Sequence, residues 1–143
     1  MQYDYFYGVQ AEQFTFYRIP KALFTDTQFK DLSTDAKVLY GILLDRMSLS
    51  LKNNWLDEQN RVYIIFTLEE IMESLNCANQ KATRLMVELE KKVGLIERKR
   101  QGLGKPCLIY VKNFVDSKQI QIHENHTELI LIIIRLIIVI LRI

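Results

Sequence analysis

Two short amphipathic helices separated by a tight turn restrict the fold of this chain more than any other feature. The first is predicted for TLEEIMESLN, in which Thr67 and Glu70 have the spacing of a capping box. Its apolar stripe consists of Leu68, Ile71, Met72 and Leu75. After the turn CAN, QKATRLMVELEKKVG predicts a second helix that stops at Gly94, with an apolar face of Ala82, Leu85, Met86, Leu89 and Val93. Two helices joined in this way predict a helix-turn-helix unit.

A β-hairpin is predicted directly after the second helix, in LIERKRQGLGKPCLIYVKNF. Two short apolar runs, near 95–100 and 107–112, flank a turn that holds two glycines, a lysine and a proline. A hairpin in this position makes the helix-turn-helix unit a winged one. The predicted fold class is therefore α+β, with a winged helix-turn-helix domain and a short N-terminal extension over residues 1–116.

The residues before this unit predict a central helix and two strands. The helix follows Ser33, a good N-cap, and carries Asp35 in its first turn. Its apolar positions are Ala36, Val38, Leu39, Tyr40, Ile42, Leu43, Leu44 and Met47. After the loop KNNWLDEQN, the β-branched and aromatic run RVYIIF predicts a strand. In the extension, QFTFYRIP predicts a short strand, and FYRIPKALF predicts an anchor that buries Ile19, Leu23 and Phe24.

Positive charge is concentrated in one block of the sequence. Residues 1–78 hold 7 Lys/Arg against 11 Asp/Glu, whereas residues 79–112 hold 9 against 3, a net charge of +6. Such blocks usually meet polyanions, most often nucleic acid. The predicted second helix and hairpin account for this block, so we expect this part of the chain to bind DNA.

The residue types in the basic block indicate two kinds of DNA contact. The first turns of the second helix carry polar side chains suited to base edges, namely Asn79, Gln80, Lys81, Thr83 and Arg84. The hairpin carries cations that we expect to contact phosphates, namely Arg98, Lys99, Arg100 and Lys105.

Enzymatic and metal chemistry have no candidate site in the sequence. Cys77 and Cys107 have no metal-binding spacing, and His123 and His126 lack a third ligand. GLGK lacks the remainder of a phosphate-binding loop. We therefore expect a protein that is not an enzyme, with no cofactor, metal or small-molecule substrate. The N-terminus MQYDYFYGVQ does not resemble a signal peptide, and we expect a cytoplasmic protein.

Several ordered blocks resemble the N-terminal domain of the RepA_N plasmid replication initiators of low-GC Gram-positive bacteria. They are FYRIPKALF, LSTDAKVLYGILLDR, YIIFTLEEIMESLNC and GLIERKRQGLGKPCLIYVKNF, and the similarity runs from about residue 10 to 116. The resemblance implies a domain that binds short direct repeats at a plasmid origin as a homodimer. In such initiators a polar linker leads to a C-terminal domain that engages host replication factors.

The C-terminal tail departs from that family pattern. Residues 117–143 read as a short polar linker followed by ELILIIIRLIIVILRI, in which 8 of the 15 residues from Leu129 onward are isoleucine. We expect a truncated initiator that lacks the C-terminal domain, with a tail produced by a frameshift and prone to β-aggregation. Two alternatives stay open: a winged-helix transcriptional regulator, and a small membrane-associated interaction protein that uses this apolar tail.

Overall fold

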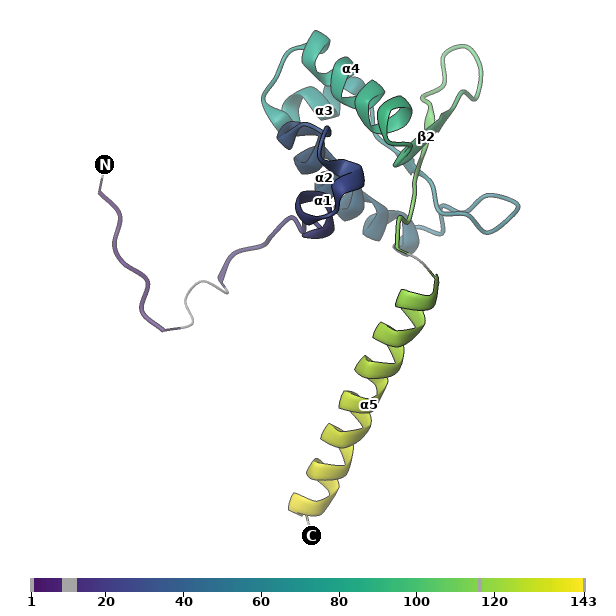
Figure 1. The fold of residues 1–143 in the computed structure, drawn as a ribbon. Coiled ribbons are helices and arrows are strands. Elements are labelled where there is room, and N and C mark those ends of the chain that lie inside the picture. The colour runs from purple at the N-terminus through teal and green to yellow at the C-terminus, as the bar shows by residue number, and fades with distance from the viewer. Residues whose placement is uncertain (1, 9–12, 116, 143) are drawn as a thin grey trace. The chain divides into compact units, whose positions relative to one another are not determined.

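The computed structural model describes residues 2–8, 13–115 and 117–142, and the side chains of 117–128 lie outside the described set (Figure 1). The chain divides into two compact units, Met1–Lys112 and Asn113–Ile143. The elements of the first unit are α1 (Ala22–Thr25), the 3₁₀ helix η2 (Thr27–Phe29), α2 (Thr34–Lys52), β1 (Ile64–Ile65), α3 (Leu68–Leu75), α4 (Asn79–Val87), the π-helical segment η3 (Glu88–Lys92), β2 (Ile96–Lys99) and β3 (Leu108–Val111).

Helix α2 is the central element, as predicted. The Ser33 hydroxyl caps it by accepting a hydrogen bond from the Ala36 amide at 3.2 Å. Gly41 lets the extension pack against this helix, because a Cβ at this position would lie 2.7 Å from Ile19 Cγ1 and 3.1 Å from the Arg18 carbonyl oxygen. The core of the unit gathers around α2 and includes Leu39, Leu43, Ile64, Ile71, Leu85, Leu89, Ile96 and Ile109.

The N-terminal extension differs from its prediction in two respects. Residues 13–20 form no strand, since the sheet of the described chain consists of β1, β3 and β2 and none of these pairs with them. Leu23 is fully buried, as expected of an anchor, but Phe24 is 56% exposed. The Phe24 ring lies against a cation instead: Lys37 Nζ is 4.7 Å from its centroid.

Helices α3 and α4 form the helix-turn-helix. The capping box is present, since the Glu70 amide donates to Thr67 Oγ1 at 3.2 Å and the Thr67 amide donates to Glu70 Oε2 at 3.1 Å. Asn76 ends α3 in the left-handed conformation. The predicted second helix is regular only to Val87 and then widens into η3, and it stops before Gly94, which has a φ of 68°.

The sheet is antiparallel with the order β1-β3-β2. Strands β2 and β3 confirm the predicted hairpin, with Ile96 opposite Val111 and Lys99 opposite Leu108. The strand predicted for RVYIIF shrinks to Ile64–Ile65 because the preceding residues fold into a loop of their own, closed by a bridge between Leu56 and Val62.

Asp57 organises that loop. Its carboxylate accepts hydrogen bonds from the Gln59 and Arg61 amides, from Arg61 Nε and, at 3.1 Å, from the Tyr110 hydroxyl of β3. Partial burial tends to raise the pKa of Asp57, but the hydrogen bonds from Arg61, Gln59 and Tyr110 outweigh burial and lower this pKa to about 2.

The lowered pKa of Asp57 predicts acid sensitivity. A carboxyl with a folded pKa below its unfolded value stabilises the fold above the unfolded pKa, and this contribution disappears as the pH falls from about 4 to about 2. We expect Asp57→Asn to flatten the dependence of the free energy of unfolding on pH in that window. Urea titrations of both proteins across this pH range measure the difference, and parallel curves would contradict the prediction.

In the second unit, Ser117–Arg142 form the single helix α5 (Figure 1). The expected polar linker is therefore helical, and the tail expected to be β-prone is helical too. Isoleucine costs a helix only a few tenths of a kcal/mol relative to the best helix formers, so intrahelical hydrogen bonding can outweigh its β-preference. From Leu129 to Arg142 every side chain is exposed. Among the described residues, no helix combines the length and the apolar character needed to cross a membrane.

Candidate nucleic-acid interface

Helix α4 presents a polar face away from the core. Its inward side chains, Ala82, Leu85 and Met86, are buried as predicted. Four of the five predicted base-reading residues are exposed: Asn79, Gln80, Thr83 and Arg84. The Thr83 hydroxyl and Asn79 Oδ1 are 3.3 Å apart and hydrogen-bonded, which leaves the amide nitrogen of Asn79 as a donor to another molecule.

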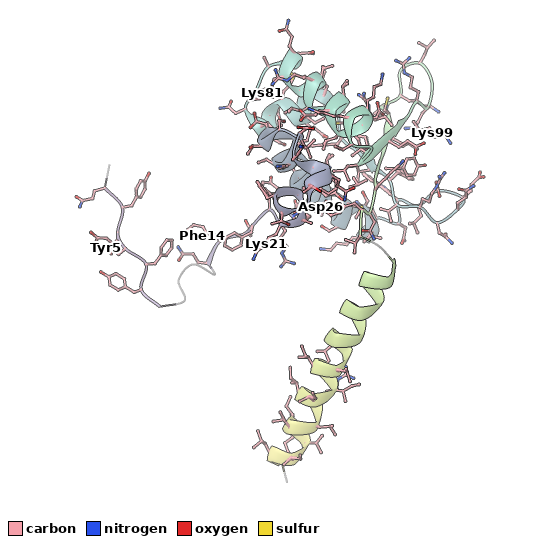
Figure 2. All side chains as sticks on the ribbon, viewed as in Figure 1. Tyr5, Phe14, Lys21, Asp26, Lys81 and Lys99 are labelled. Atoms are coloured by element: carbon pink, nitrogen blue, oxygen red, sulfur yellow. The ribbon has the colours of Figure 1, made fainter. Side chains whose placement is uncertain are left out.

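Lys81 has a partner within the protein. Its Nζ lies 2.8 Å from Asp35 Oδ2 in the first turn of α2, and the two side chains are 43% and 53% exposed. An exposed pair of this kind contributes at most about 1 kcal/mol, so Lys81 can exchange Asp35 for a phosphate or a base at small cost. Figure 2 shows Lys81 at the end of the helix-turn-helix that is remote from Lys99 on the hairpin. The base-reading role of Lys81 stays a prediction.

Arg98, like Lys81, has a partner within the protein. Its guanidinium is held by Glu90 of η3, with Nη2 to Oε1 at 3.0 Å and Nε to Oε2 at 3.2 Å, and the Arg98 amide donates to the same carboxylate at 3.0 Å. The hydrogen bonds from Arg98 lower the pKa of Glu90, so the carboxylate stays charged. The pair is bidentate, its side chains are 32% and 21% exposed, and it joins β2 to η3. The phosphate contact of Arg98 stays a prediction.

The other three hairpin cations point to solvent. Lys99, Arg100 and Lys105 are exposed, and within the described chain no carboxylate forms an ion pair with any of them. Lys112, farther from the tip, is neutralised by Glu97 at 3.5 Å. The uncompensated charge of the hairpin is thus concentrated near its tip, where a phosphate can approach it.

A hollow of about 460 Å³ lies between the helix-turn-helix and the hairpin. Its lining includes Thr83 and Met86 from α4, Phe66 before α3, and Lys105 and Cys107 from the hairpin. Arg98 lines it as well, so the hollow brings one predicted base-reading residue, Thr83, and two predicted phosphate contacts, Arg98 and Lys105, to the same surface. In Figure 1 the hairpin rises beside α4, as this shared lining requires.

Three acidic residues that support this surface could not be recognised in the sequence. Glu90 holds Arg98, Asp35 holds Lys81, and Glu88 accepts hydrogen bonds from the Ser33 amide and hydroxyl at the start of α2. Glu90 is eight residues before Arg98, but the two lie on different elements, η3 and β2. The Glu88 contact spans 55 residues and has no local signal.

The helix-turn-helix, the antiparallel hairpin that follows it and the cations around one hollow define a winged helix-turn-helix protein. The family model described as "Replication initiator protein A (RepA) N-terminus" matches residues 15–124. The chain belongs to this RepA_N family, as the sequence blocks predicted.

Solved structures agree with this membership. The chain is similar to "N-Terminal domain of DNA binding protein", with 39% identity, a TM-score of 0.66 and coverage of 88% of this chain and 96% of that one. It is similar to "Structure of Rep-DNA complex", with 39% identity, a TM-score of 0.65 and coverage of 87% and 95%. "Structure of MDR initiator" is 38% identical, with a TM-score of 0.63 and coverage of 87% and 98%.

A curated relative is much longer than the matching region. The "41 kDa protein" of Lactobacillus helveticus is 34% identical over 87 residues, which is 61% of this chain and 24% of that protein. The chain thus matches about a quarter of the length of this relative.

Proposed function

We propose that this chain binds double-stranded DNA at short direct repeats of a plasmid origin, as the DNA-binding part of a replication initiator and without catalysis of its own. The observation that carries the proposal is the shared hollow, which brings Thr83 of the polar face of α4 and the unpaired cation Lys105 of the hairpin to one surface. Membership of the RepA_N family and the similarity to a Rep-DNA complex support the same function.

Helix α4 is the base-reading element in this proposal. Helix-turn-helix proteins place the N-terminal residues of their second helix against base edges in the major groove. Gln80 and Asn79 offer the amides that pair with adenine, and Arg84 offers the planar fork that pairs with guanine O6 and N7. In the described chain no carboxylate pairs with Arg84, so its guanidinium is available without breaking an internal contact.

The hairpin supplies affinity in this proposal. Lys99, Arg100 and Lys105 would neutralise phosphates beside the reading helix and release condensed counterions. These contacts carry no sequence information, but they set the position of α4 on the duplex. The Arg98–Glu90 pair joins the hairpin to η3 and so favours the formation of both contacts together.

The proposed oligomer is a homodimer. Its support is the family resemblance together with the aromatic extension, in which Phe14, Phe16 and Tyr17 are between 51% and 62% exposed. Large exposed aromatic side chains are typical of protein–protein interfaces. Sedimentation equilibrium of the chain with and without residues 2–17 tests this, and a monomer in both cases would contradict it.

The function itself is tested by titrating a labelled repeat and a scrambled duplex of the same length at several salt concentrations. Specific binding requires an affinity for the repeat about 10³-fold or more above that for the scrambled duplex, with a linear loss of log affinity against log salt. Equal affinity for the two duplexes would reduce the proposal to unspecific binding, and no binding to either would contradict it.

The apolar tail is not needed for this function. We expect deletion of residues 129–143 to raise solubility and leave repeat binding within about twofold, because α4 and the hairpin lie in the first unit, and removing exposed apolar surface lowers self-association. Light scattering and the same DNA titration measure both effects. Loss of repeat binding by a deletion variant that keeps its circular dichroism spectrum would give the tail a role in DNA binding.

A further inference from the structure

The tip of the hairpin displays one apolar side chain to solvent. Leu103 is 105% exposed, the highest value of any large apolar residue that the structure describes. Its neighbours Gly102 and Gly104 have φ values of 126° and 77°, which L side chains rarely adopt. A scattered exposed leucine is ordinary on a protein surface. This leucine is unusual because the backbone on both sides of it is shaped to present it.

The tip is held in this conformation by its own hydrogen bonds. Gln101 Nε2 donates to the Pro106 carbonyl at 2.8 Å, and the Lys105 amide donates to the Gly102 carbonyl at 3.4 Å. Gly102 and Gly104 carry no side chains, so the tip is narrow on both sides of Leu103, and a Cβ built on either glycine would point into open space. The narrow tip is suited to a groove of limited width, such as the minor groove of B-DNA at about 6 Å.

The charges around the tip indicate which kind of surface the tip binds. Arg100 precedes Leu103 by three residues and Lys105 follows it by two, and both are exposed. Two cations that flank a projecting apolar side chain fit a minor groove, in which phosphates line both edges and the floor is made of stacked bases. Minor-groove proteins commonly insert leucine or a similar residue between base steps and bend the duplex.

We propose that Leu103 is an apolar wedge that enters the minor groove next to the base pairs read by α4, partly unstacks one base step and bends the DNA. The inference rests on the proposed function and adds a second mode of sequence recognition. Pyrimidine–purine steps unstack most easily, so a TA or CA step under the tip should be preferred although no hydrogen bond reads it.

The test compares wild type with Leu103→Ala on a repeat labelled with a fluorescent donor and acceptor at its two ends. The matched control is Leu51→Ala, which removes an exposed leucine from α2, outside the hairpin. For Leu103→Ala we expect the bend measured by energy transfer to fall to near that of free DNA and Kd to rise about tenfold. The physical reason is that alanine is too short to hold the base step unstacked. We expect the salt dependence to stay unchanged, because no charge is lost.

A second arm replaces the candidate step by a purine–pyrimidine step within the same repeat. Wild type should lose several-fold affinity on this DNA, whereas Leu103→Ala should lose little. If wild type binds the repeat and Leu103→Ala binds and bends it equally well, the wedge is refuted while the proposed function stands. If wild type binds neither duplex, the proposed function fails and the wedge fails with it.

Discussion

Replacing Arg84 by alanine is expected to weaken binding to the cognate repeat by about 1–3 kcal/mol and to change binding to scrambled DNA much less. Arg84 is exposed on α4, one turn from the start of that helix, and in the described chain no carboxylate forms an ion pair with it. Its guanidinium can therefore contact guanine O6 and N7 with the planar fork that lysine lacks.

Two further variants separate base recognition by Arg84 from its electrostatic attraction to phosphates. Arg84→Lys keeps the charge but loses the planar guanidinium. This variant should therefore lose most of its preference for the repeat and keep most of its affinity for scrambled DNA. Lys91→Ala removes an exposed cation from η3 and serves as the control. Titrations of the repeat and the scrambled duplex at one salt concentration compare each variant with wild type on both DNAs. An equal loss on both DNAs would make Arg84 a phosphate contact, and no loss on either would remove it from the interface.

Neutralising Lys99, Arg100 and Lys105 together is expected to weaken binding to every duplex. Each lost phosphate contact should also reduce the log–log salt slope by about one unit, so the triple variant should lose up to about three. The physical reason is counterion release, to which only cations that neutralise phosphates contribute. Affinities measured between about 50 and 200 mM salt give the slope directly.

The control for this variant removes the same charge elsewhere. Lys21, Lys30 and Lys52 are exposed and belong to the α1 and α2 region, so their replacement by glutamine changes the net charge equally without touching the hairpin. A flattened slope in both variants would show that only the total charge matters. An unchanged slope in the hairpin variant would exclude the hairpin as a phosphate clamp. Arg98→Gln should leave the slope unchanged, because Glu90 already holds that charge.

The sequence alone determined the helices and the hairpin of the winged helix-turn-helix, because these elements depend on local chemistry. The capping box of Thr67 and Glu70, the N-cap of Ser33 and the stop before Gly94 each involve residues within a few positions of one another. The buried face of α4 follows from helical periodicity, which is likewise local. The hairpin strands followed from two apolar runs around a glycine-rich turn.

Only the tertiary structure decided which charged groups are available for DNA. Arg98 and Lys99 are adjacent in a basic run, yet Glu90 holds the first and leaves the second free, because successive side chains of a strand point to opposite faces. Likewise, Lys81 meets Asp35 only because α2 and α4 pack together. The exposure of Phe24 and the shortening of β1 were also decided by the contacts available in three dimensions, which residue patterns do not contain.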